Sequence, residues 1–291
     1  MKINSVVTGF ILGAGGIATL NAMDAVVKSL GASLPTLQIV FVRFAGAALW
    51  LGIFLLLTAN PWPRRRNFKR HAARGMLMAL TAFFFFYGVT HLPLAIAAAL
   101  AMSAPIYVSF FGIVLLKEPA TPALVLAILL GICGSMIIVF GGTSVVVTGS
   151  ADILAWGAAI LAPVCYASAL VLIKHHSTDE GSAGMAFAQS VVAALIASPF
   201  AAYSYVAPTA HAWAQIALVG FLGALGFLLL ISGLRKLPAS VFSLIDYTGL
   251  LWAAAFGFLF FAETAELNLW IGGGLIIAAC TIGMRTTKKH N

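Results

Sequence analysis

The chain has 291 residues, of which 62% are hydrophobic and only 8% are charged, and its formal net charge is +8. About a quarter of the residues in a soluble domain are charged, so this composition excludes an ordinary soluble protein. The apolar runs reach the roughly 20 residues that cross a ~30 Å hydrocarbon core. They also lack the alternating segments of about 10 residues that form membrane barrels. The predicted fold class is an all-α integral membrane protein.

Clusters of charge, Pro and Gly divide the chain into ten predicted membrane helices. They lie near residues 5–28, 35–58, 73–91, 93–116, 122–142, 152–174, 182–203, 213–234, 238–261 and 267–285. Because Lys and Arg accumulate in cytoplasmic loops, the basic loop "NPWPRRRNFKRHAAR" and the basic tail predict that both termini are cytoplasmic. We expect a multi-pass protein of the bacterial inner membrane, and these charges indicate topology rather than nucleic-acid binding.

The first two predicted helices hold charges near their outer ends. Asp24 and Lys28 are four residues apart and share one face of helix 1, and Arg43 lies at a similar depth in helix 2. An Asp24–Arg43 or Asp24–Lys28 pair that joins the helices is the favoured interpretation. The alternative is an outer gate, or a binding site for a substrate carboxylate on Arg43.

Two prolines interrupt apolar helices further along the chain. Pro105 is predicted in the middle of helix 4 and Pro163 in the middle of helix 6. Each removes a backbone hydrogen bond and kinks its helix. The freed carbonyls are tolerated where they face protein or a cavity, so a fixed kink, a hinge and a ligand for a substrate amine all remain open.

Asp246 is a lone carboxylate in the predicted helix 9. It lies eight residues after Pro238, about 12 Å along a helix and near the middle of the bilayer. A charge there is costly, and such residues usually face a water-filled cavity or a partner. We predict a cavity acid that binds a substrate ammonium group or exchanges a proton. The alternative is a structural carboxylate, hydrogen-bonded to Tyr166 or Tyr247.

Small polar and aromatic residues at middle depth resemble the composition of a small-molecule pocket. The candidates for substrate binding, besides Asp246, are Asn21, Tyr87, Ser103, Tyr107, Tyr166, Tyr247 and Trp252, with Thr248 beside them. The chain shows no phosphate-binding loop "GxxxxGK[ST]", no metal-ligand spacing and no buried His pair for catalysis, so we expect neither a cofactor, a metal nor an enzyme. Glu118 and Glu263 end two helices and are predicted to cap or join neighbours.

The chain contains a weak internal repeat. Under a shift of 145 residues, the second half matches the first at Gly88 and Gly233, Leu92-Pro93 and Leu237-Pro238, Gly112 and Gly257, and Glu118 and Glu263. The predicted domains are therefore residues 1–145 and 146–291. Each half has five helices, an odd number, so the second half enters the membrane inverted. Inverted repeats with a site near the midplane are typical of secondary transporters.

The motifs resemble the EamA-type members of the drug/metabolite transporter superfamily. The resemblance rests on "NAMDAVVKSL", "PTLQIVFVRF", the Leu-Pro openings of helices 4 and 9, and "DYTGLLWAAAFGFLFFAE" followed by "LWIGGGLIIAAC". It covers essentially the whole chain. It implies a central cavity lined mainly by helices 1, 3, 4, 6, 8 and 9, and substrates such as amino acids and related metabolites.

The expected function is a secondary transporter or facilitator for small polar metabolites. We expect amino acids as substrates, moved by alternating access in the export direction, and a monomer whose partners are a small-molecule substrate and the lipid bilayer. The alternative within this class is riboflavin or a nucleoside-like compound. Outside it, the alternatives are a membrane sensor or assembly partner and, least favoured, an intramembrane lipid-modifying enzyme.

Overall fold

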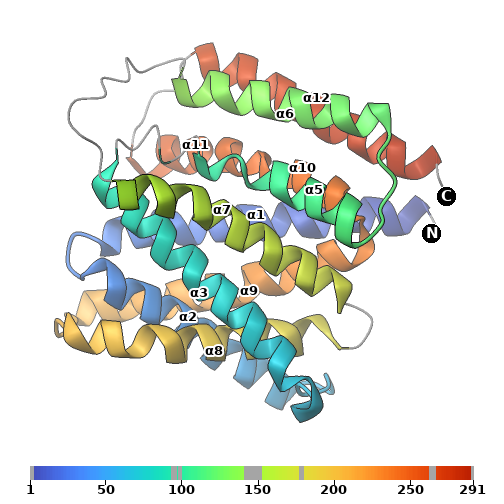
Figure 1. Ribbon diagram of the computed structural model, residues 1–291. Coiled ribbons are helices and arrows are strands. Elements are labelled where there is room, and N and C mark those ends of the chain that lie inside the picture. Colours follow the sequence, from blue (N-terminus) through green and yellow to red (C-terminus); the bar gives the residue numbers. More distant parts are fainter. Residues whose placement is uncertain are drawn as a thin grey trace.

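The computed structural model describes residues 3–92, 97, 100–140, 153–176, 180–261 and 267–289, which form helices and connecting loops without a strand (Figure 1). The helices are α1 (Ile3–Leu30), α2 (Thr36–Leu57), the 3₁₀ turn η1 (Arg65–Asn67), α3 (Phe68–His91), α5 (Ala104–Leu115), α6 (Pro122–Phe140), α7 (Ile153–His175), α8 (Ser182–Tyr203), α9 (Ala210–Lys236), α10 (Ala239–Asp246), α11 (Thr248–Phe261) and α12 (Leu267–Lys289). Within the described residues, eight segments are long and apolar enough to cross a membrane.

The main helix contacts join the first half of the chain to the second. α1 packs along α9, α3 along α7, α2 against α8, α6 against α12 and α5 against α10. In the internal repeat, α1 corresponds to α7 and α5 corresponds to α11. The pattern is the same when the halves are exchanged, because α1 contacts α11 and, equivalently, α7 contacts α5. Both chain termini lie at one end of the bundle (Figure 1). We call this the basic end, and the other the opposite end.

Glycine pairs allow the closest of these contacts. A Cβ at Gly46 of α2 would lie 2.7 Å from the Cα of Gly220 in α9. A Cβ at Gly16 of α1 would lie 2.6 Å from the backbone nitrogen of Leu230. Small residues let membrane helices approach closely, and the contacts at Gly46 and Gly16 are of this kind.

The predicted helix 238–261 is not continuous. It is divided into α10 and α11, with Tyr247 between them. The predicted span itself agrees with Ala239–Phe260, which is long and apolar enough to cross a membrane, but no proline marks the interruption within it. The predicted helix 93–116 is also interrupted: residues 102 and 103 form a turn, and α5 begins at Ala104 with Pro105 in its first turn. Proline suits that position because it lacks the N–H that a first turn leaves unpaired.

The two interruptions occupy equivalent places in the repeat. A shift of 145 residues places Met102 on Tyr247, and each lies at the turn before a helix restarts. Discontinuous helices at corresponding positions of two halves are a feature of transporter binding sites.

A hydrogen-bonded contact at the basic end joins the segment after α5 to the start of α10. The carboxylate of Glu118 accepts hydrogen bonds from the backbone nitrogens of Ala239 (2.6 Å) and Ser240 (2.9 Å) and from the Ser240 hydroxyl (2.6 Å). Further along, the hydroxyls of Ser109 and Ser243 lie 2.7 Å apart. The predicted capping role of Glu118 is confirmed, whereas Glu263 lies outside the described residues.

A buried cluster of charges lies where the loop before α8 meets the start of α3. Glu180 lies 3.2 Å from Nε2 of His71 and 3.8 Å from the Arg74 guanidinium, and it also accepts hydrogen bonds from the Asn67 side chain and the Arg64 backbone. The Glu180, His71 and Arg74 side chains are at most 6% exposed. We call Glu180, His71, Arg74 and Asn67 the Glu180 cluster.

Candidate functional site

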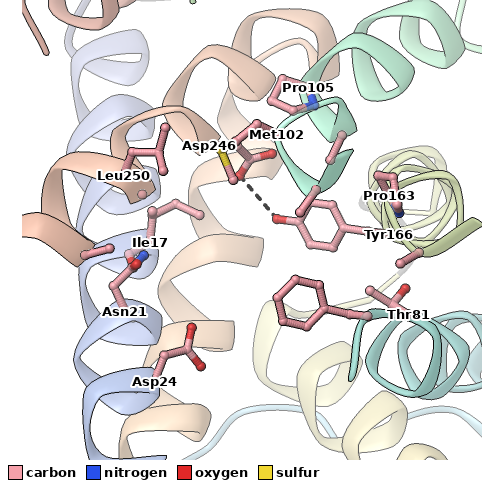
Figure 2. A pocket seen from close by; sticks show the side chains of 16 residues that line it. Ile17, Asn21, Asp24, Thr81, Met102, Pro105, Pro163, Tyr166, Asp246 and Leu250 are labelled. Carbon is pink, nitrogen blue, oxygen red and sulfur yellow. Dashed lines mark hydrogen bonds between the residues drawn. The ribbon is translucent and has the colours of Figure 1, made fainter. Parts of the chain in front are cut away.

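A central cavity of about 340 Å³ lies beside the two helix interruptions (Figure 2). Its walls come from α1, α3, residues 101 and 102, and α5, α7, α10 and α11. The lining residues are Ile17, Asn21, Asp24, Thr81, Phe85, Ala101, Met102, Ala104, Pro105, Ala162, Pro163, Tyr166, Asp246, Gly249, Leu250 and Ala253. This volume falls within the range of small-molecule sites.

Asp246 is the acidic group at the end of α10. Its Oδ1 accepts a hydrogen bond of 3.2 Å from the Tyr166 hydroxyl (Figure 2). Its Oδ2 is buried and lacks a hydrogen-bond partner in the part of the chain that the structure describes. Burying a carboxylate oxygen without a partner is costly. The hydrogen bond to Tyr166 predicted under the structural interpretation therefore exists, but it uses only one of the two oxygens.

A second cavity of about 490 Å³ adjoins the first. The two share Asp24, Thr81, Phe85 and Tyr166 in their linings, so they form one continuous site. Lys28, Arg43 and Phe227 are found only in the second cavity. We call the first part the acid chamber and the second part the basic chamber.

The charges of the basic chamber are loosely paired. Arg43 and Asp24 approach to 3.9 Å, which is an ion pair but too long for a hydrogen bond. The Asp24 side chain is 59% exposed and that of Arg43 21% exposed. A carboxylate so exposed inside a helix bundle indicates that the chamber admits water. The predicted Asp24–Arg43 pair is therefore present, in a form that leaves the guanidinium available to a ligand.

Five of the candidate residues in addition to Asp246 line the acid chamber. Asn21 contributes from α1, but its amide donates to the backbone oxygen of Ile17 in the same helix. Tyr166 and Pro163 contribute from α7, and Pro105 from the start of α5. Asp24 and Tyr166 belong to both chambers.

The other candidates for substrate binding lie outside the linings of the two chambers. Tyr247 is fully buried and packs on Gly131 of α6. Tyr87 is 38% exposed and stacks on His91 of its own helix. Trp252 is 37% exposed and stacks on Phe256. Ser103 donates to the backbone oxygen of Leu100, and Tyr107 lies partly buried on α5.

Several lining residues were not anticipated from the sequence, among them Thr81, Phe85 and Met102. Thr81 and Phe85 project from α3 into both chambers, and Met102 lies at the turn before α5. Phe85 belongs to the run "FFFF" at 83–86, which presents rings in every direction around the helix. The signal that identifies Met102 is its alignment with Tyr247 in the internal repeat.

Comparisons with known proteins place the chain in a family. The EamA-like transporter family matches residues 7–140 and again residues 153–284. The pseudopaline exporter CntI of Pseudomonas aeruginosa is 30% identical over 99% of this chain and 100% of its own length. A riboflavin transporter of Brucella anthropi is 26% identical over 87% and 89%. An S-adenosylmethionine uptake transporter of Rickettsia felis is 22% identical over 99% and 97%.

The fold is shared with a protein of known structure. A crystal structure with 16% sequence identity superposes with a TM-score of 0.82, over 94% of this chain and 97% of the other. At that identity the likeness concerns the fold alone. The two family matches together cover most of the sequence, and the relatives span nearly its full length. The chain is a membrane transporter that belongs to the EamA-like transporter family.

Proposed function

We propose that the protein is a secondary transporter that moves small polar metabolites with an ammonium group, foremost amino acids and their derivatives. The observation that carries this proposal is the buried Oδ2 of Asp246, an acceptor without a partner among the described residues, beside a cavity of suitable size. An ammonium group placed there completes the hydrogen bonding of the carboxylate and neutralises its charge.

We further propose ten membrane helices arranged as two inverted repeats, residues 1–145 and 146–291. The support is threefold: the family matches the chain twice, the helix contacts persist when the halves are exchanged, and the interruptions at Met102 and Tyr247 correspond. An odd number of helices in each half gives the inversion. One chain lines the whole cavity, so a monomer suffices.

Transport proceeds by alternating access in this proposal. At the basic end, α5 and α10 are joined through Glu118 and the Ser109–Ser243 contact, while the chambers extend toward the opposite end. With the basic end in the cytoplasm of a bacterial cell, as the Lys and Arg distribution favours, this arrangement faces outward. Rocking the halves around Asp246 exposes the site to the cytoplasm.

Export is the proposed direction. A relative that aligns with nearly the whole chain is an exporter, although relatives that take up S-adenosylmethionine share the family. Direction is therefore a property to be measured rather than one that the fold dictates.

The test is flux in proteoliposomes for the wild type and Asp246→Asn, with and without a pH gradient. Labelled amino acids, short peptides, riboflavin and nucleosides serve as substrates. We expect saturable flux of an amine-bearing compound that falls at least tenfold in Asp246→Asn. Dependence on the gradient would make Asp246 a coupling acid, and independence would make it a substrate ligand in a facilitator. Wild-type flux in the mutant would contradict the proposed role of Asp246.

Riboflavin is a second candidate substrate. It is favoured by the aromatic rings of Phe85 and Tyr166, which line both chambers, and by the riboflavin transporter among the relatives. Flux of riboflavin without flux of amines in the same liposomes would select this alternative.

A further inference from the structure

We infer that the site takes a zwitterion longer than an α-amino acid, with its ammonium and carboxylate groups about four to six bonds apart, as in a dipeptide. The inference rests on the proposed transport function and specifies its substrate class. It follows from the polarity of the site, which holds an acid in one chamber and a cationic pair in the other.

The basic chamber offers a site for an anion. Arg43 and Lys28 both belong to its lining, and Arg43 lies beside the carboxylate of Asp24. The Nε of Arg43 is buried and has no hydrogen-bond partner within the described residues. Its nearest acid, Asp24, stands at 3.9 Å, and its guanidinium carbon lies 5.5 Å from the centre of the Phe44 ring. A guanidinium with spare donors and low exposure is suited to binding a carboxylate.

The acid chamber offers the complementary site. The Oδ2 atom of Asp246 has no partner within the described residues and can accept hydrogen bonds from a ligand. The other oxygen, Oδ1, is held by the hydrogen bond from Tyr166. Tyr166 also lines the basic chamber, so the acid chamber and the basic chamber adjoin at this residue. One ligand that reaches both ends satisfies the spare acceptor of Asp246 and the spare donors of Arg43 together.

The register of α1 against α10 and α11 sets the distance between the two ends. A Cβ at Gly13 would touch Ile245, and a Cβ at Gly249 would touch Ile17 and Asn21. The helices therefore run in parallel, and Asp246 lies level with the α1 turn that follows Gly13. Asp24 is seven residues beyond Ile17, which is about 10 Å along the helix. Asp246 and Arg43 are thus separated by roughly 10–13 Å along the bundle.

The separation excludes a free α-amino acid as a bridge. About 3 Å at each end is occupied by the hydrogen bond to the protein, which leaves roughly 4–7 Å between the ligand's charges. An extended chain spans about 1.2 Å per bond, so about four to six bonds fit, whereas an α-amino acid has two between its nitrogen and its carboxylate carbon. The chambers, of about 340 and 490 Å³, hold a compound of dipeptide size.

The experiment measures binding to the purified protein by calorimetry with a graded series of probes. Glycine, 4-aminobutanoate, 6-aminohexanoate and 8-aminooctanoate differ only in the number of bonds between the charges. The compound 6-aminohexanamide keeps the length and the ammonium group but lacks the carboxylate. We expect 6-aminohexanoate to bind at least tenfold more tightly than glycine and than the amide.

Variants test whether Arg43 binds the carboxylate group of the probe. In Arg43→Gln, binding of 6-aminohexanoate should fall to the level of the amide, while binding of the amide stays unchanged. Arg43→Lys keeps a positive charge and should retain part of the preference for 6-aminohexanoate over the amide. That result would show that a substitution at this position leaves the fold intact. Arg66→Gln, at an exposed loop position, is the matched control. Asp246→Asn should weaken both compounds.

The inference is overturned if glycine binds best, if affinity does not depend on length, if no probe binds, or if Arg43→Gln weakens acid and amide equally. These results are distinct from failure of transport. Length-dependent binding without flux in liposomes would reject the transport function and keep the inference. Flux of short amino acids without a length preference in binding would support the transport function and reject the inference.

Discussion

Two groups of charges lie within the helical bundle, and they differ in how many protein groups surround the carboxylate. In the Glu180 cluster, a carboxylate meets a histidine, an arginine, an asparagine amide and a backbone N–H. At the cavity, Asp246 has one hydrogen bond and a bare oxygen, and Arg43 meets its acid only at 3.9 Å. The Glu180 cluster joins the loop before α8 to the start of α3, whereas the cavity charges line an open space.

The difference separates structural charges from functional ones. A buried charge is tolerated when its partners replace the water it has lost. In the Glu180 cluster, a histidine and an arginine lie within ion-pair distance of the carboxylate and two hydrogen bonds reach its Oε1, although Glu180 Oε2, His71 Nε2 and Arg74 Nε lack hydrogen-bond partners among the described residues. Asp246 and Arg43 meet that condition only in part, and a ligand in the cavity could supply the hydrogen bonds that Asp246 Oδ2 and Arg43 Nε lack. Variants that remove a partner should therefore harm stability at the first site and transport at the second.

The largest effect on stability is expected for Glu180→Gln. The substitution leaves Arg74, only 1% exposed, without a compensating charge, and breaking a buried pair in this way costs about 3 kcal/mol or more. Thermal unfolding of the purified protein in detergent measures the loss. Arg66→Gln in the adjacent exposed loop is the control and should melt like the wild type. Equal melting of all three proteins would show that the Glu180 cluster does not stabilise the fold.

A smaller loss is expected for Glu118→Ala. The substitution leaves the backbone nitrogens of Ala239 and Ser240 without their acceptor at the start of α10. Loss of a helix cap typically costs about 1–2 kcal/mol. Glu118→Gln keeps an acceptor oxygen and should lose less, as measured by the same thermal unfolding. An alanine variant as stable as the wild type would contradict the capping role.

Acidification should weaken the Glu180 cluster through His71. Burial lowers the pKa of the His71 imidazole below its ordinary value of 6.5, although Glu180 opposes the shift. His71 lies before the predicted span 73–91, and Arg74 donates to its Nδ1 over 2.6 Å, which requires an unprotonated nitrogen. Because the folded state binds the proton less readily, the stabilisation is complete above pH 6.5 and is lost as the pH falls through the lowered pKa.

The measurement for His71 is the unfolding temperature between pH 7.5 and pH 5. The wild type should lose stability toward acid more steeply than His71→Gln, which keeps hydrogen-bonding groups but does not titrate. Parallel profiles of the two proteins would remove His71 as the cause.

The smallest effect on stability is expected for Asp246→Asn. The Tyr166 hydroxyl still has an oxygen to donate to, and the cost of a buried charge disappears, so stability should change by less than about 1 kcal/mol or rise. Thermal unfolding beside the flux assay tests whether loss of transport occurs in a stable protein. A variant that unfolds like Glu180→Gln would place Asp246 with the structural charges.

The sequence predicted the helices well because their length and composition are set by the bilayer. It also predicted that Asp246 lies deep in the bundle, since its distance from Pro238 along a helix is fixed. The rotation of each helix was harder to predict. Segments such as 83–86 are apolar on every side, so composition does not reveal which ring faces the cavity, and Tyr87 and Trp252 lie outside the chamber linings.

The interruption at Tyr247 could not be predicted from local sequence. At Pro105 a missing backbone donor marks the restart of a helix. The equivalent position in the second half is Leu250, an ordinary helix former. The Glu180 cluster was likewise hidden, because Glu180 and Arg74 are far apart in the sequence and only the packing of α3 and α8 brings them together.

The interruption after Asp246 also bears on how the chain enters the bilayer during synthesis. α10 has 8 residues and α11 has 14, and neither reaches the roughly 20 residues that a membrane span needs. The two must therefore be inserted together as one apolar segment. Asp246 opposes that step by about 3 kcal/mol, and the Leu, Ile, Val and Phe side chains on both sides offset it. A substitution that removes apolar side chains from α11 would thus lower the amount of protein inserted before it alters transport.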